Sequence, residues 1–419
     1  MKEILIALFL VRFAAVTLLR FLNVRHLQQH GGQVPEEFAG AVDAETLAKS
    51  ADYTVAQSRV SLLHSIYDGG LLLAFLFTPL FPRFDAWINT LSGSFYLRSL
   101  LFMLILTLVE TILDLPFSYY STFELEKRYG FNTTTMKLWL SDLAKSTLIS
   151  VVLLLVVGWS ALALVKHSPD HWWLWVWAFF ALFSITLMYL SPYLIEPLFS
   201  KFEPVSDKEL EEEIRLLLDR CGLKIKAVQQ VDASRRSLHS NAYFTGIGKV
   251  KRIVLYDTLL KQMDHGEVLA ILAHEAGHWK KGHILKMLVG TELVALAVCY
   301  VVFRLIGWGA VPAMFGINGV SFAGQLVLIS FILSLVSFLF TPLRSWLSRR
   351  NEWQADRFAT ELTGAPQALA RALVKLSREN LANLHPHPLY AAFYYSHPPV
   401  VERIANLNAA GGKGARSAV

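Results

Sequence analysis

Seven long apolar stretches constrain this chain more than any other feature of its sequence. Each approaches or exceeds the roughly 17–25 residues that a helix needs to cross a bilayer. Apolar residues make up 54% of the chain and charged residues only 17%, against roughly 45–50% and 25% in soluble proteins. Buried core helices could account for one or two of these stretches, but not for the whole set. The predicted membrane spans are residues 4–22, 60–81, 99–118, 147–166, 172–192, 286–307 and 320–343.

The first stretch could instead be a cleaved signal peptide. It lacks a clear small-x-small cleavage site, and Arg12 interrupts its apolar run, so we interpret it as a retained span.

The distribution of Lys and Arg between the spans predicts the orientation. The positive-inside rule places the first, third and fifth loops and the C-terminus in the cytoplasm, and the N-terminus outside. We expect a multi-pass protein of a bacterial inner membrane or of the endoplasmic reticulum. The net charge of +6 is scattered, which excludes nucleic acid as an expected partner. The first and third loops hold Arg25, Lys49, Arg59, Lys127, Arg128, Lys137 and Lys145, whereas the fourth and sixth hold little beyond Lys166 and Arg304.

The more polar segments predict how the chain is divided. Residues 1–199 carry spans one to five, and residues 286–343 carry spans six and seven. Residues 200–285 are predicted to form a small cytoplasmic α+β insert that ends in a helix. Residues 344–410 are predicted to be helical, and 411–419 to be a disordered tail. The fold class is therefore an all-α polytopic membrane protein with a small α+β insert, whose β-like runs are 227–231, 242–244 and 252–256.

The pattern H-E-x-x-H of zinc proteases occurs in the predicted helix that ends the insert. Its two histidines, His274 and His278, project from one helix face, so both can bind the same metal ion. Glu275 lies beside them, where it can deprotonate a metal-bound water. A motif this short can occur by chance, so the other residues of the chain must show whether it is part of a metal site.

A catalytic zinc needs a third protein ligand. Glu352 is the best candidate, because Glu352 and Asp356 are spaced i, i+4 on a predicted helix. One carboxylate can bind the metal while the other accepts the free N–H of a ligating histidine. The alternative is the ordinary acidic face of a solvated helix.

A donor that stabilises a tetrahedral oxyanion would complete the site. His397 is the strongest candidate, because Pro398 and Pro399 hold it on a rigid segment. Proline also follows other histidines, so rigidity alone does not single out His397. The alternatives, each of which could be a polar surface residue, are His239, His283, His385 and His387.

Two further groups of residues have open interpretations. A predicted strand that includes Tyr243 and Phe244 could pair with an extended substrate backbone, or could simply pack the core of the insert. Acidic residues within the predicted spans would be costly in contact with lipid. They either face an interior cavity or pair with residues such as Arg12, Arg98 or His64, and they are Asp68, Glu110, Asp114 and Glu292.

Taken together, these segments resemble the type I CaaX prenyl proteases, a family of integral-membrane zinc endopeptidases. The resemblance covers most of the chain and follows one order along it. It rests on residues 123–132, 197–199, 239–246, 252–260, 274–278, 352–356 and 396–399, followed by Glu402 and Arg403.

The resemblance implies seven helices around a water-filled intramembrane chamber that a single zinc ion faces. Members of the family cleave the peptide bond after a prenylated cysteine and release the terminal tripeptide, and some cut other membrane-associated peptides. Prenylated or other membrane-associated peptides, together with the lipid bilayer, are therefore the expected partners. The implied roles are zinc ligand for His274, His278 and Glu352, general base for Glu275, carboxylate behind the ligands for Asp356, and transition-state stabiliser for His397. The candidate substrate-contacting residues are Asn241, Ala242, Tyr243, Phe244 and Arg403.

Two other functions remain as alternatives. The compact loops suit a bacterial inner-membrane protein, and quality-control cleavage of damaged membrane proteins would be its equivalent activity. A membrane scaffold with a vestigial site is the alternative from a different class, against which the complete set of ligands and base argues.

Overall fold

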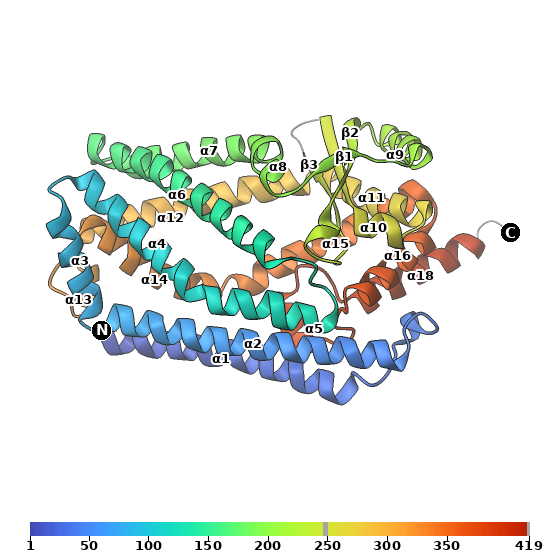
Figure 1. The fold of residues 1–419 in the computed structure, drawn as a ribbon, viewed down its shortest axis with the longest axis horizontal. Coiled ribbons are helices and arrows are strands. Elements are labelled where there is room, and N and C mark those ends of the chain that lie inside the picture. The colour runs from blue at the N-terminus through green and yellow to red at the C-terminus, as the bar shows by residue number, and fades with distance from the viewer. Residues whose placement is uncertain (246–249, 417–419) are drawn as a thin grey trace.

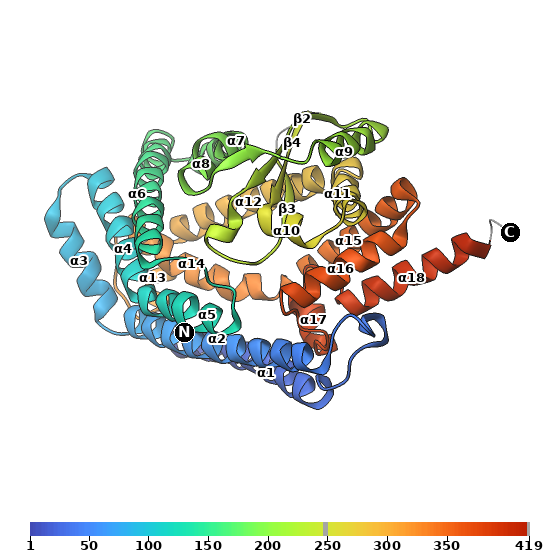
Figure 2. The ribbon, with the colours of Figure 1, turned by 45° about the vertical axis from the view of Figure 1, so that its right-hand side comes forward.

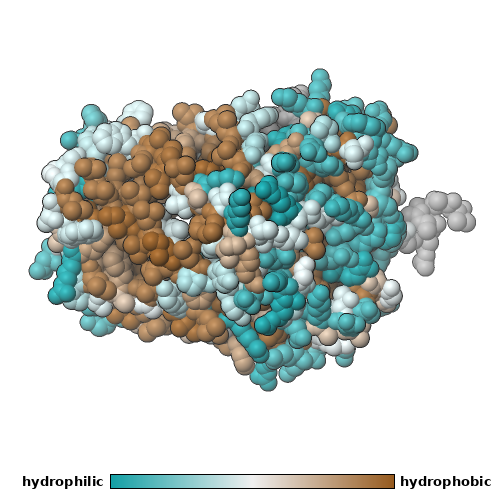
Figure 3. Space-filling view, viewed as in Figure 1, coloured by the Kyte–Doolittle hydropathy of each residue, from teal (hydrophilic) through white to brown (hydrophobic). Residues whose placement is uncertain are grey.

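The computed structural model describes residues 1–245 and 250–416, so residues 246–249, which include Gly246, and residues 417–419 lie outside the described part. Long helices run along the longest axis, and a small sheet with shorter helices gathers at one end (Figures 1 and 2). Apolar residues dominate the surface of the long helices, and polar residues dominate the other end (Figure 3). The helices are α1 (Lys2–His30), α2 (Ala44–Phe77), α3 (Leu80–Leu91), α4 (Phe95–Tyr120), α5 (Lys127–Tyr129), α6 (Met136–His167), α7 (Trp172–Leu194), α8 (Glu196–Phe199), α9 (Lys208–Arg220), α10 (Asp257–Gln262), α11 (His265–Lys280), α12 (His283–Trp308), α13 (Val311–Met314), α14 (Phe322–Phe338), α15 (Thr341–Thr363), α16 (Pro366–Glu379), α17 (Pro388–Tyr394) and α18 (Val400–Arg416).

Within the described residues, six helices are long and apolar enough to cross a membrane. They are α1, α2, α4 with its continuation to Tyr129, α6, α7 with its continuation to Phe199, and α12. Helices α14 and α15 meet at 55° and form a seventh if the bent pair is one span. Each predicted stretch falls mainly on one of these helices, so the polytopic helical fold is confirmed.

Prolines end two of the predicted spans earlier than the apolar pattern indicates. Helix α2 ends at Phe77 rather than at residue 81, because Pro79 disfavours a helical Thr78, which is extended. Helix α14 ends at Phe338 rather than at residue 343. Pro342, in the first turn of α15, has no N–H to donate to the carbonyl of Phe338.

The insert contains a four-stranded sheet with the strand order β1-β2-β4-β3. Its strands are β1 (Phe202–Pro204), β2 (Lys224–Val231), β3 (Ala242–Thr245) and β4 (Val250–Tyr256). Strands β2 and β4 are parallel, and the other two pairs are antiparallel. The three predicted runs correspond to β2, β3 and β4, whereas β1 is too short to show a pattern.

Helix α11, which carries the zinc motif, shares one core with this sheet. Leu210 and Ile214 of α9, Ile253 of β4, and Leu272 and Ala276 of α11 are all buried in it. The motif is therefore built on a packed element of the insert.

A polar cluster ties the insert to the membrane helices. Glu126 ends a π-helical segment, Ser121–Glu126, that follows α4. Its carboxylate accepts a 2.6 Å hydrogen bond from the Tyr53 hydroxyl of α2 and lies 3.2 Å from Nε2 of His239. The other ring nitrogen of His239 lies 3.1 Å from Oδ1 of Asn380, just after α16. The cluster thus joins α2, the segment after α4, the insert and the segment after α16, which are distant in sequence.

Two of the acidic residues in the predicted spans are paired. Nε2 of His64 lies 2.7 Å from a carboxylate oxygen of Asp114 and 3.2 Å from one of Asp68. This pairing links α2 with α4 and supports the structural interpretation of these two carboxylates.

The C-terminal helix is longer than the sequence predicts. Helix α18 continues to Arg416, whereas the sequence predicts a disordered tail from Gly411. Extending a helix that has already formed costs much less than starting one, which explains how the Gly- and Ala-rich segment continues it.

Candidate metal centre

Helices α11 and α15 approach each other closely at the motif. A Cβ atom on Gly277 would lie 3.0 Å from the Cα of Ala355, which is tighter than most contacts that Cβ atoms make. Glycine inside the motif therefore permits the close packing of the two helices. Because Glu352 precedes Ala355 by about one turn, this packing also sets the distance between Glu352 and the histidines of α11.

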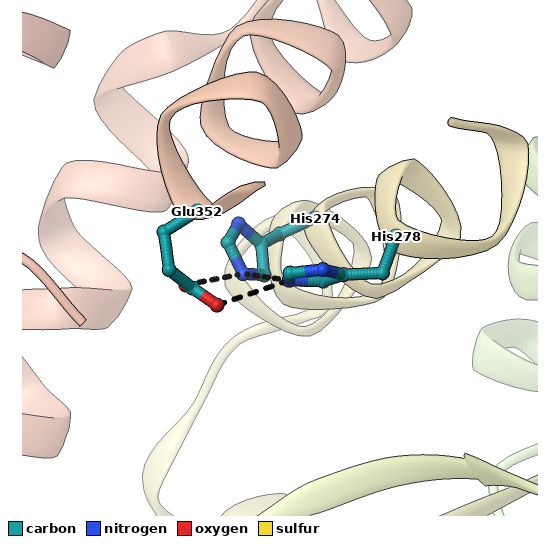
Figure 4. Close-up of side chains that lie close together, drawn as sticks. All are labelled: His274, His278 and Glu352. Atoms are coloured by element: carbon teal, nitrogen blue, oxygen red, sulfur yellow. Dashed lines mark hydrogen bonds and ion pairs between the residues drawn. The ribbon is translucent and has the colours of Figure 1, made fainter. Parts of the chain in front are cut away.

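His274 and His278 point from α11 toward Glu352 on α15 (Figure 4). The two Nε2 atoms are 3.2 Å apart. Nε2 of His274 lies 3.2 Å from Oε2 of Glu352, and Nε2 of His278 lies 3.2 Å from Oε1. One atom from each side chain lies within 4.8 Å of the others, so the three residues could hold one metal ion.

The geometry of these atoms fits a tetrahedral metal. Metal–ligand bonds of about 2.0–2.1 Å give a tetrahedron with edges of about 3.3 Å, close to the separations above. Oε2 of Glu352 is buried and has no hydrogen-bond partner among the described residues, which suits an atom that binds a cation. Two imidazoles and a carboxylate are also a common ligand set for a catalytic metal.

A buried ion pair lies behind His274. Its Nδ1 is 2.7 Å from Oδ1 of Asp356. Arg403 of α18 donates to both oxygens of Asp356, at 2.6 and 2.8 Å. Burial alone would lower the pKa of His274, but the carboxylates of Asp356 and Glu352 raise it to about 9. The negative field that favours a proton on this ring also favours a divalent cation beside it.

Glu275 and His397 are close to the three converging residues but are not among the possible metal ligands. Glu275 makes no hydrogen bond or ion pair with any described residue, and burial raises the pKa of its carboxyl. Nε2 of His397 lies 3.5 Å from Oε1 of Glu352. The His397 side chain is 60% exposed, yet burial lowers its pKa. Both observations fit a ring that faces a water-accessible space enclosed by protein.

Comparisons with known proteins agree with this geometry. The model of the CAAX prenyl protease N-terminal region, with five membrane helices, matches residues 23–201, and that of peptidase family M48 matches residues 204–410. CAAX prenyl protease 1 of Saccharomyces cerevisiae is 33% identical over 90% of this chain and 88% of the relative. The chain belongs to peptidase family M48. It is also 31% identical to an uncharacterized metalloprotease of Bacillus subtilis, YhfN, over 88% of this chain and 89% of that one.

A solved structure in the same family extends the agreement to the fold. The crystal structure of S. mikatae Ste24p superposes with a TM-score of 0.90 at 32% identity, covering 97% of this chain and 99% of that one. The chain is thus an integral, multi-pass membrane metalloprotease of the M48 family, and the family implies a metal cofactor.

The structure separates the histidines that the sequence left as alternatives. His239 lies in the polar cluster with Glu126. His385 contacts the backbone carbonyl of Gln33, and His387 accepts a hydrogen bond from Leu389 N at the start of α17. His397 lies at the metal group, and so does His283, whose Nδ1 is 3.1 Å from Nδ1 of His278. No pattern in the sequence predicts the contact between His278 and His283, because it depends on how α12 follows α11.

The predicted substrate-contacting residues fall into two groups. Ala242, Tyr243 and Phe244 lie on β3, which is at the edge of the sheet, and Asn241 directly precedes it. Arg403 is different, because it is 7% exposed and its guanidinium is occupied by Asp356. This placement argues for a role in positioning Asp356 rather than for substrate contact.

Proposed function

We propose that this chain is a zinc endopeptidase that removes the C-terminal tripeptide after a prenylated cysteine at the cytoplasmic face of a membrane. The observation that carries the proposal is that ligand atoms of His274, His278 and Glu352 lie within 4.8 Å of one another. The carboxylate of Glu275, beside His274 in the sequence, makes no hydrogen bond with the described residues. The similarity to CAAX prenyl proteases over about nine-tenths of the chain supports the substrate class.

Zinc is the metal that the donor set favours. Two imidazole nitrogens and one carboxylate, at separations that fit a tetrahedron, leave a fourth position for water or substrate. When bound, zinc polarises a substrate carbonyl and lowers the pKa of water at that position. The ligands in this proposal are His274, His278 and Glu352.

The remaining residues of the group have distinct proposed roles. Glu275 accepts the proton of the attacking water and passes it to the leaving amine, and the raised pKa of its carboxyl suits both steps. His397 donates a hydrogen bond to the oxyanion that forms at the scissile carbonyl. Asp356 accepts the Nδ1–H of His274, which directs Nε2 toward the metal.

The edge of β3 that faces away from β4, which no other described strand covers, is the proposed binding site for the substrate backbone. Tyr256 N donates to Asn241 O, and hydrogen-bonded pairs alternate along an antiparallel ladder. With the register of β3 on β4, the N–H and C=O groups of Ala242 and Phe244 then point away from β4. The N–H of Ala242 is bonded to the side chain of Asn241. Phe244 therefore offers the available N–H for an added strand.

Quality-control cleavage of membrane proteins is the second candidate. The similarity to a Bacillus subtilis metalloprotease over most of both chains favours this function. The name of that relative mentions no prenylated substrate, so the shared catalytic residues do not by themselves imply one. In that function the same residues would act on unprenylated membrane-associated peptides.

Cleavage of matched peptides tests the two candidates. The purified protein in lipid vesicles is incubated with a peptide that ends in a farnesylated C-a-a-X sequence and with the same peptide lacking farnesyl. Release of the tripeptide from the farnesylated peptide alone is the expected result. Equal cleavage of both peptides, or cleavage at other bonds only, contradicts CaaX processing and favours the quality-control function.

A further inference from the structure

His278 has a buried partner on its side away from Glu352. Its Nε2 is one of the three converging ligand atoms, and its Nδ1 lies 3.1 Å from Nδ1 of His283. His283 is only 3% exposed. Its Nε2 lies 3.2 Å from Oε1 of Gln354 on α15. A chain of three side chains therefore runs from a proposed metal ligand back to the helix that carries Glu352.

Hydrogen-bond chemistry determines where the protons of this chain lie. If Nε2 of His278 offers a lone pair to a metal, the proton of the neutral ring is on Nδ1. Nδ1 of His283 must then accept that N–H, which places the proton of His283 on Nε2. That N–H donates to the amide oxygen of Gln354, which can only accept. Only one placement of the protons gives both hydrogen bonds a donor and an acceptor. In it, neither N–H is directed at the metal.

The turn between α11 and α12 puts His283 in this place. Gly282 has a φ of +69°, in the left-handed region that glycine adopts without strain. This conformation lets α12 begin at His283, immediately after the end of α11. Gln354 lies two positions after Glu352, so the same turn of α15 supplies a metal ligand and the end of the chain.

The two histidine ligands thus have partners of different charge. His274 is backed by a carboxylate, Asp356, whose charge is balanced by Arg403. His278 is backed by a neutral imidazole and a neutral amide. This neutral partner fixes the orientation of His278 without adding another buried negative charge to the site.

We propose that His283 is a positioning residue of the metal centre. It accepts the Nδ1–H of His278, holds this ring in the tautomer and orientation in which Nε2 binds the metal, and is itself held by Gln354. The proposal rests on the metal centre of the proposed function but not on its substrate.

The affinity of the purified protein for zinc, measured by competition with a chromogenic chelator, tests the proposal. His283→Phe keeps a ring but removes the acceptor, and we expect zinc to bind about 10–100-fold more weakly. His283→Asn places its side-chain oxygen near the position of Nδ1, so we expect affinity within about threefold of the wild type. His171→Phe, at an exposed turn before α7, is the matched control and should bind zinc like the wild type.

Each result supports or overturns the proposal. Wild-type affinity in His283→Phe contradicts it, and an equal loss in His283→Phe and His283→Asn shows that the ring serves packing alone. If His283→Phe does not fold, Gln354→Leu decides, because removal of the terminal acceptor should also weaken zinc binding, and wild-type affinity there overturns the proposal. Failure to cleave a prenylated peptide would leave this zinc measurement unaffected, so the two proposals can fail separately.

Discussion

At the scale of residues, the ion pair between Arg403 and Asp356 carries much of the order of the metal centre. Both side chains are buried, and both oxygens of Asp356 accept from the guanidinium. Oδ1 of Asp356 is therefore held where it can also accept the N–H of His274. Removal of one partner from a buried pair leaves a charge without compensation, at a cost of roughly 3–5 kcal/mol.

Arg403→Leu should therefore destabilise the metal-free protein by roughly 3–5 kcal/mol and weaken zinc binding. The measurement is denaturant-induced unfolding of the purified protein in detergent, with a zinc titration beside it. Arg403→Lys is the matched variant: it keeps the charge but cannot donate in a bidentate fork, so it should lie between the leucine variant and the wild type. Unchanged stability and zinc affinity in Arg403→Leu would show that Asp356 does not depend on this pair.

The sequence predicted the members of the centre better than their roles. Chemistry and spacing single out His274, Glu275 and His278, because a helical pair of histidines with a glutamate between them is a specific pattern. The role of Arg403 could not be predicted, since it depends on the packing of α18 against α15. The hydrogen-bonded chain through His283 was also beyond prediction, because it requires the turn at Gly282.

At the scale of elements, β3 is the strand whose position matters most for the proposed reaction. Strand β3 pairs with β4 along one edge, and none of the described strands pairs with its opposite edge. Its side chains also pack, since Ala242 is buried and Phe244 contacts the core of the insert. Strand β3 can therefore both pack the core of the insert and pair with a substrate backbone, the two interpretations that the sequence leaves open.

Phe244→Pro should impair substrate binding, because it removes the N–H that points to the free edge. The loss of one hydrogen bond of about 0.5–1.5 kcal/mol corresponds to roughly a two- to tenfold rise in KM. Steady-state kinetics on the farnesylated peptide measure this effect, and Phe244→Leu keeps an apolar side chain and the N–H as a control. Equal KM values for the two variants would exclude backbone pairing at this residue.

The long elements could be predicted from the sequence, and their ends could not. Apolar length alone identified the spans, but Pro79 and Pro342 end helices within apolar runs. Strand β1, of three residues, is held by its pairing with β2 rather than by a pattern of its own.

At the scale of the whole molecule, the proposed orientation places the insert, the metal centre and the C-terminus in the cytoplasm. The basic residues of the first and third loops support this assignment. The polar end of the molecule, which holds the sheet, lies opposite the turn between α6 and α7 (Figure 1).

Labelling of single cysteines from one side of the membrane tests this orientation. Glu212→Cys in α9 and Asp170→Cys between α6 and α7 are both at exposed positions, and Cys221 and Cys299 are first replaced by serine. A membrane-impermeant thiol reagent added outside intact cells should label position 170 and not position 212. Labelling of 212 alone would reverse the assignment.

The measurement that tests the central claim most directly is peptide cleavage by Glu275→Gln, with zinc content determined on the same sample. Glutamine keeps the size of the side chain but cannot accept the proton of water, so we expect activity to fall by at least about 10²–10⁴-fold. Zinc content should stay near one equivalent, because Glu275 is not among the converging ligands. The His274→Ala variant should lose activity and zinc together. Wild-type cleavage by Glu275→Gln, or by the zinc-free wild type, would contradict a metallopeptidase mechanism at this site.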